Sequence, residues 1–129
     1  MRAQAFALAD DNRKAIDAIE EAIDAAERTG ERWYEPELLR IKAEILASDA
    51  IADVRAAETC LEESIATASR QGAILWESRA RIDLARLLAA QHREAVASSV
   101  VEPMQTWGRD IDLPERDRAQ TLFDRLNGR

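Results

Sequence analysis

The sequence predicts an all-α fold, a right-handed α-α superhelix of about seven helices paired as antiparallel hairpins. Ala, with 25 residues, dominates the chain of 129 residues together with Leu, Arg and Glu, and all four favour helices. Gly and Pro together number only 7, too few for the turns of a β-sandwich or propeller. A chain of this length can bury a core as one domain, so we take residues 1–129 as a single domain.

Internal repetition is the third observation behind this fold. A shift of 42 residues places residues 15–46 on residues 57–88, with small, large and charged residues in register. The matches include Ala15 with Ala57, Ile23 with Ile65, Gly30 with Gly72, Glu35 with Glu77, and Ala43 with Ala85. Helix pairs that recur every ~34–42 residues are typical of tetratricopeptide-type solenoids.

Seven segments have apolar residues at helical spacing or carry helix boundary signals. They cover residues 2–9, 13–28, 34–47, 54–70, 75–90, 93–107 and 114–127. The first six form three predicted helix pairs, 2–28, 34–70 and 75–107, and the seventh is a capping helix. Asp11 is the expected N-cap of the second segment and separates it from the first.

Glycine and proline mark the predicted boundaries. Gly30 and Gly72 follow apolar helical stretches, where a left-handed residue commonly ends a helix. Pro36 and Pro114 suit the first turn of a helix, which needs no amide donor at that position. Pro103 falls inside an apolar stretch, so we expect it to kink that helix or end it early.

Small residues recur where neighbouring helices are expected to cross. They are Ala5, Ala43 and Ala85 on the first helix of each pair, and Ala15, Ala57 and Ala95 on the second. An Ala side chain lets two helices approach closely, whereas Leu or Ile at the same place would hold them apart. We therefore expect these six residues at helix–helix contacts.

The charge pattern excludes some partners. The net charge is −7, and residues 1–64 carry 16 acidic and 8 basic side chains. Such a surface repels phosphate backbones and anionic lipids, so we expect no nucleic-acid or membrane partner. The single cysteine, Cys60, cannot form an intrachain disulfide, and no apolar run spans a bilayer, which together predict a cytoplasmic protein.

The chain offers little catalytic chemistry, and we predict no catalytic residue, metal site or cofactor. The only histidine, His92, is expected in a solvated turn, and Cys60 is expected to be a small core residue. A run of carboxylates is expected to face solvent: Asp17, Glu20, Glu21, Asp24 and Glu27. Three aromatics, Trp33, Tyr34 and Trp76, could line a ligand pocket, although packing between repeats is the favoured interpretation.

Two stretches carry a family resemblance. Residues 31–46, ERWYEPELLRIKAEIL, and the segment from Arg70 to Leu87 resemble the C-terminal tetratricopeptide region of bacterial multidomain signalling proteins. Those proteins combine that region with a STAND-type ATPase and with an adenylate or guanylate cyclase or a transcriptional regulator. The resemblance covers residues 5–127, including a closing helix from Trp107 to Leu126. The turn at residues 91–93 is about two residues shorter than the family pattern.

The resemblance implies a bacterial signalling protein, either a part excised from a longer chain or a short stand-alone or decayed reading frame. No cyclase or ATPase motif is present, so neither activity carries over. We expect a non-enzymatic module that binds a protein or peptide partner. The alternative is a ligand-sensing segment that controls an attached ATPase or cyclase. An enclosed polar pocket would favour the sensor, and a long open groove would favour the module.

In a tetratricopeptide stack the first helix of each pair lines the groove. The expected groove residues, predicted to be exposed on the helices 34–47 and 75–90, are Glu37, Arg40, Glu44, Arg79, Ile82 and Arg86. The planar guanidinium of arginine suits a carboxylate or phosphate, so these arginines could select an acidic peptide. The favoured interpretation is that they pair with Glu37, Glu44 and Asp83 instead. Phe6 and Leu8, on a helix without an earlier repeat, predict a homodimer through the N-terminal helices.

Overall fold

The structure, a computed structural model, describes residues 2–107 and 114–128, with side chains from Asp10 onward. Every regular element in these ranges is helical, which confirms the all-α prediction. The elements are α1 Arg2–Thr29, α2 Glu35–Leu46, α3 Val54–Gln71, α4 Ile74–Ala90, α5 Glu94–Val101, the 3-10 helix η1 Glu102–Thr106, and α6 Pro114–Leu126. The described residues thus form six α-helices and one 3-10 helix, where the sequence predicted about seven helices.

The difference in number comes from α1, which is one helix of 28 residues where the sequence predicted two, at 2–9 and 13–28. Asp11 lies inside it, so the predicted N-cap is wrong. No Gly or Pro interrupts residues 2–29, and Asp or Asn in a helix costs only ~0.7 kcal/mol relative to Ala. Lys14 bonds Asp10 one turn away at 3.2 Å, across the predicted break. Long as it is, neither α1 nor any other described helix is apolar enough to cross a membrane.

The predicted boundaries elsewhere are confirmed. Gly30 and Gly72 adopt left-handed φ angles of +81° and +68° directly after α1 and α3. Pro36 lies in the first turn of α2, and Pro114 is the first residue of α6. Pro103 has no amide hydrogen for an α-helical bond, and α5 ends two residues before it and continues as η1. Backbone chemistry that is local to these residues therefore fixes where the helices end.

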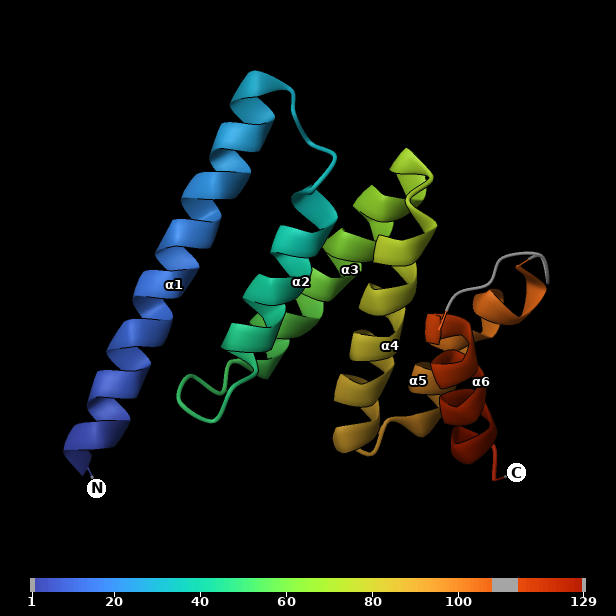
Figure 1. The fold of residues 1–129 in the computed structure, drawn as a ribbon. Helices are drawn as coiled ribbons and strands as arrows, with labels where there is room; N and C mark the ends of the chain where they lie inside the picture. Colours follow the sequence, from blue (N-terminus) through green and yellow to red (C-terminus); the bar gives the residue numbers. More distant parts are fainter. Residues whose placement is uncertain (1, 108–113, 129) are drawn as a thin grey trace.

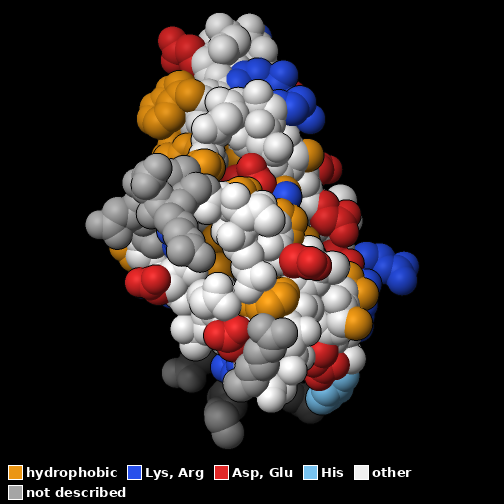
Figure 2. Space-filling view, turned by 90° about the vertical axis from the view of Figure 1, so that its right-hand side faces the viewer, with side chains coloured by type: hydrophobic (Ala, Val, Ile, Leu, Met, Phe, Trp, Pro, Cys, Tyr) orange, Lys and Arg blue, Asp and Glu red, His pale blue; other side chains and the backbone are white. Residues whose placement is uncertain are grey.

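The helices alternate in direction and form two series (Figure 1). Helices α2, α4 and α6 contact one another in turn, while α3 packs against α2 and α4, and α5 against α4 and α6. Helix α1 lies at one end of the row and packs against α2. On the face that carries α5 and α6, Figure 2 shows acidic and basic side chains interspersed with small hydrophobic patches. The uninterrupted series α2, α4 and α6 carries the groove described below.

Three of the six alanines predicted at helix–helix contacts are buried in the core. Ala43, Ala57 and Ala85 are at most 1% exposed, and leucines such as Leu61 and Leu88 surround them. Ala15 is half-buried on α1, and the side chain of Ala5 lies outside those described.

The prediction for Ala95 is wrong, because this residue is exposed and Ala97 is fully buried in its place. Two residues correspond to about 200° around a helix, so the opposite face of α5 packs on the core. The turn before α5, residues 91–93, is shorter than the corresponding turn at residues 47–53. Helix α4 ends 44 residues after α2 does and the turn is four residues shorter, so α5 begins 40 residues after α3, which carries Ala57 onto Ala97.

Candidate functional site

The series α2, α4 and α6 carries three adjoining hollows. The first, of about 430 Å³, lies between α2 and α4, the second, of about 340 Å³, joins α2, α4 and the start of α6, and the third, of about 300 Å³, lies between α4 and α6. Arg40, Asp83 and Arg86 border both the first and the second hollow, and Arg86 and Arg118 border both the second and the third. The hollows thus adjoin one another and are open to solvent, and we call them the α2–α4–α6 groove.

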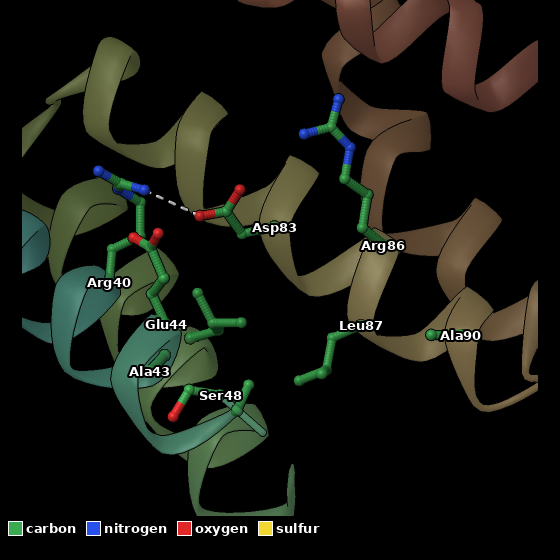
Figure 3. Close-up of a pocket in the computed structure, with 10 residues that line it drawn as sticks. Arg40, Ala43, Glu44, Ser48, Asp83, Arg86, Leu87 and Ala90 are labelled. Atoms are coloured by element: carbon green, nitrogen blue, oxygen red, sulfur yellow. Dashed lines mark hydrogen bonds and ion pairs between the residues drawn. The ribbon is translucent and has the colours of Figure 1, made fainter. Parts of the chain in front are cut away.

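The first hollow has an apolar floor and a polar rim (Figure 3). Its apolar lining consists of Ala43, Ala47, Leu61, Leu87 and Ala90. The polar lining consists of Arg40, Glu44, Ser48, Asp83 and Arg86. Ala43 is one of the small residues that recur in the repeat, and its side chain leaves room that a leucine would fill. The hollow can therefore accept an apolar side chain, and the charged groups at its edge lie close to the residues next to that side chain.

Arg40 joins α2 to α4. Its Nε donates to Oε2 of Glu37 at 3.0 Å, its Nη2 donates to Oε1 of the same carboxylate, and its Nη1 donates to Oδ2 of Asp83 at 3.0 Å. The bond to Glu37, followed by that to Asp83, raises the pKa of the Arg40 guanidinium above its ordinary value despite partial burial. Glu37 is only 5% exposed, so its charge depends on Arg40. Two carboxylates therefore neutralise Arg40, as the favoured interpretation of the sequence predicted.

Arg79 joins α4 to α6 in a similar way. Its Nε donates to Oε1 of Glu115 at 3.2 Å, and its guanidinium lies 5.4 Å from the ring centroid of Trp76. Glu115 is 6% exposed, and its Oε2 has no hydrogen-bond partner among the described residues. Arg79 supplies the charge that opposes this buried carboxylate and is held at the helix interface.

Arg86 differs from the other two arginines. It is exposed, it borders all three hollows, and no ion pair joins it to any residue that the structure describes. In Figure 3 a dashed line joins Arg40 to Asp83, while none reaches Arg86. Two further exposed arginines, Arg118 and Arg125 on α6, line the third hollow with it and likewise have no ion pair within residues 2–107 and 114–128.

Five of the six predicted groove residues line the groove, and the structure corrects the exposure expected of Glu37 and Ile82. Arg40, Arg79, Ile82 and Arg86 line the second hollow, and Arg40 and Arg86 share the first with Glu44. Glu37 was expected to be exposed but is buried under Arg40. Ile82 was also expected to be exposed but is 3% exposed and forms part of the floor.

Sequence reasoning missed Arg118 and Arg125. Their separation of seven residues places them on one face of a helix, a signal that was available. Because helix 114–127 was interpreted as a cap, its face was not joined to the groove. The residues predicted for self-association, Phe6 and Leu8, belong to α1, but their side chains lie outside those described.

The remaining candidates lie apart from the groove. His92 is an exposed turn residue with φ of +61°, and the five carboxylates from Asp17 to Glu27 are exposed, both as predicted. Cys60 is buried, which raises the pKa of its thiol. Among the described residues, no three His, Cys, Asp or Glu side chains are grouped closely enough to hold a metal ion.

The aromatic residues are packed only in part. Tyr34 meets Trp76 edge to face, with ring centroids 5.7 Å apart, and this contact joins the start of α2 to α4. Trp33 stacks obliquely on Tyr34 at 5.2 Å but is 67% exposed, so the prediction of packing between repeats is wrong for this residue.

Comparison with known proteins adds no relative. No protein-family description, curated protein or solved structure matches the chain. The functional argument therefore depends on the residues of the groove.

Proposed function

We propose that the chain is a non-catalytic interaction module, a tetratricopeptide-like repeat domain of a cytoplasmic bacterial signalling protein, and that the α2–α4–α6 groove binds a segment of a protein partner. The observation that carries the proposal is that the three hollows adjoin one another and that Arg86 borders all of them. An extended segment can contact three helices in succession along such a groove, and each contact adds to its affinity.

The rigidity of the groove also supports this function. Arg40 ties α2 to α4 through Asp83, and Arg79 ties α4 to α6 through Glu115. These inter-helix bonds help to fix the spacing of the three helices before a partner binds, which reduces the conformational entropy lost on binding.

The alternative is a small-molecule sensor that regulates an attached ATPase or cyclase. A sensor site usually encloses most of its ligand and directs a few polar groups into it. The hollows here are open along their length, and two of the groove arginines are already neutralised by carboxylates. This geometry favours the interaction module over the sensor.

Site-specific photocrosslinking tests the proposal. A photoreactive amino acid is placed at Glu44 in the first hollow or at Thr121 in the third, and at Glu62 on α3 as a control. All three residues are exposed, so the fold should tolerate the replacement. The expected result is the same protein crosslinked in cells from Glu44 and Thr121 but not from Glu62.

The outcomes separate the candidate functions. Crosslinking that does not depend on position, or that is absent from both groove positions, would contradict a peptide-binding groove. If metabolites raise the melting temperature of the purified protein while the groove positions capture nothing, the sensor becomes the better explanation.

A further inference from the structure

We propose that the segment bound in the groove carries an apolar side chain that seats in the first hollow and, next to it, carboxylates that bind Arg86, Arg118 and Arg125. This inference rests on the proposed function and adds the chemistry of the partner. It moves the acid-binding residues from the three arginines that the sequence suggested, Arg40, Arg79 and Arg86, towards α6.

The first step is the division of the groove arginines into two groups. Arg40 and Arg79 are paired with buried or partly buried carboxylates, so they have little charge left for a ligand. Arg86, Arg118 and Arg125 are exposed and have no ion pair within the described ranges. As far as residues 2–107 and 114–128 show, this second group can form new bidentate bonds to a carboxylate without breaking an existing ion pair.

The second step is their placement. Arg118 and Arg125 lie seven residues apart on α6, about 10 Å along one helix face, and Arg86 faces them from α4. The third hollow between these arginines also contains the carboxylate of Asp117. Its lining therefore carries two more positive than negative charges, in a protein whose net charge is −7.

The third step is the apolar floor of the first hollow. Ala43, Leu61 and Leu87 face a space of about 430 Å³, enough for a leucine or phenylalanine side chain. Arg86 borders this hollow as well as the third, so an apolar residue and a carboxylate close together in one segment can reach both. Apolar burial supplies affinity, and the arginines select acidic over neutral neighbours.

The charges on the rest of the surface favour one orientation of the bound segment along the groove. Glu44 lies at the α2 end of the groove, and the exposed carboxylates of α1, among them Glu21 and Asp24, lie on the helix that packs against α2. They repel a carboxylate at that end, while Arg118 and Arg125 attract it at the α6 end. The acidic part of the partner should therefore lie over α4 and α6, with its apolar residue towards α2.

Fluorescence anisotropy with synthetic peptides of about 12 residues, long enough to span the groove when extended, tests this assignment. The probe peptide holds one Leu followed by three Glu in a Gly/Ser background. One variant replaces the three Glu with Gln, and another replaces the Leu with Ser. Titrations at about 0.05 M and about 0.5 M NaCl change the Debye length from roughly 14 Å to roughly 4 Å.

The protein variant is Arg118→Glu with Arg125→Glu. Its control, Arg13→Glu with Arg55→Glu, changes the net charge equally at two exposed arginines that line none of the three hollows. Circular dichroism and thermal melting of both variants test whether the fold persists.

We expect the probe peptide to bind the wild-type protein and to bind about tenfold or more weakly after the Glu→Gln change or in the Arg118→Glu, Arg125→Glu variant. The Leu→Ser peptide should also bind more weakly, whereas the control variant should bind the probe as the wild type does. High salt should reduce the difference between the Glu and Gln peptides.

Four results would overturn the inference. Equal binding of the Glu and Gln peptides would remove the role of the arginines, and equal losses in both protein variants would indicate general charge attraction. Tighter binding of a thymidine oligonucleotide than of the probe peptide would assign the arginines to another class of partner. If groove crosslinks form while every peptide fails, the inference is wrong and the proposed function stands; if the crosslinks fail as well, both are wrong.

Discussion

Replacing Ala97 with Leu should destabilise the protein, whereas the same change at Ala95 should not. Ala97 is 0% exposed on α5, within the core that includes Leu88, Val101 and Leu122. Ala95 lies on the same helix but is exposed. The two variants have the same composition and nearly the same helix propensity, so any difference between them reports the buried face of α5.

The magnitude follows from the space at each position. A leucine adds three carbon atoms at Ala97, where no surface is left, and such overpacking lowers the free energy of unfolding by ~1–3 kcal/mol. At Ala95 the added atoms extend into solvent, so the change should stay within ~0.5 kcal/mol. For a domain of this size, each kcal/mol corresponds to roughly 3–5 °C in melting temperature.

Urea unfolding followed by circular dichroism gives the free energies of both variants, and m-values equal to that of the wild type would show that the transitions are comparable. Loss of stability in Ala95→Leu together with wild-type stability in Ala97→Leu would refute the reasoning. That pattern would mean that α5 is rotated by about 200°, as the predicted contact position of Ala95 requires.

Three further predictions concern single side chains. Arg40→Met should lower the unfolding free energy by ~2–4 kcal/mol, because it leaves the carboxylate of Glu37 buried and unpaired, and adding Glu37→Gln should restore part of the loss in a urea titration. Iodoacetamide should alkylate Cys60 in the folded protein about a hundredfold more slowly than in urea, as followed by mass spectrometry, because burial raises the pKa of the thiol and blocks access. Since this pKa is higher in the folded state, the stability gained from the neutral thiol should be full below the unfolded pKa and fall as the pH rises through the folded value; equal alkylation rates would contradict burial. Gly72→Ala should lower the unfolding free energy by ~1 kcal/mol through its left-handed φ of +68° alone, because an added Cβ meets no atom within 4 Å, and an unchanged thermal melt would contradict this.

The helix boundaries could be predicted because they depend on chemistry within a few residues. Pro36, Pro103 and Pro114 cannot donate an amide hydrogen, and Gly72 ends a helix in a left-handed conformation wherever it lies in the fold. The same reasoning went wrong at Asp11, where a residue that can cap a helix lies inside one. A capping side chain stabilises a helix start but does not force one, because nothing at residues 10–12 removes a backbone hydrogen bond.

The groove could be predicted only in outline. The repeat placed Arg40 and Arg86 on first helices, and both line the groove. The sequence could not show that Glu37 lies buried beneath Arg40, because the exposure of a helical residue depends on which helix covers it. Nor could it show that Arg79 meets Glu115, a residue 36 positions away on another helix.

The sequence by itself determined that this chain is helical, where most of its helices end, and which alanines recur in the first helices. The first two properties follow from backbone chemistry within a few residues, and the third follows from a 42-residue period along the chain. Only the tertiary structure decided that Ala97 and not Ala95 faces the core, and that α6 continues the series of α2 and α4. It also decided that Arg79 pairs with Glu115 on another helix, because such an ion pair requires two side chains at a suitable distance and angle, which the packing of the helices sets.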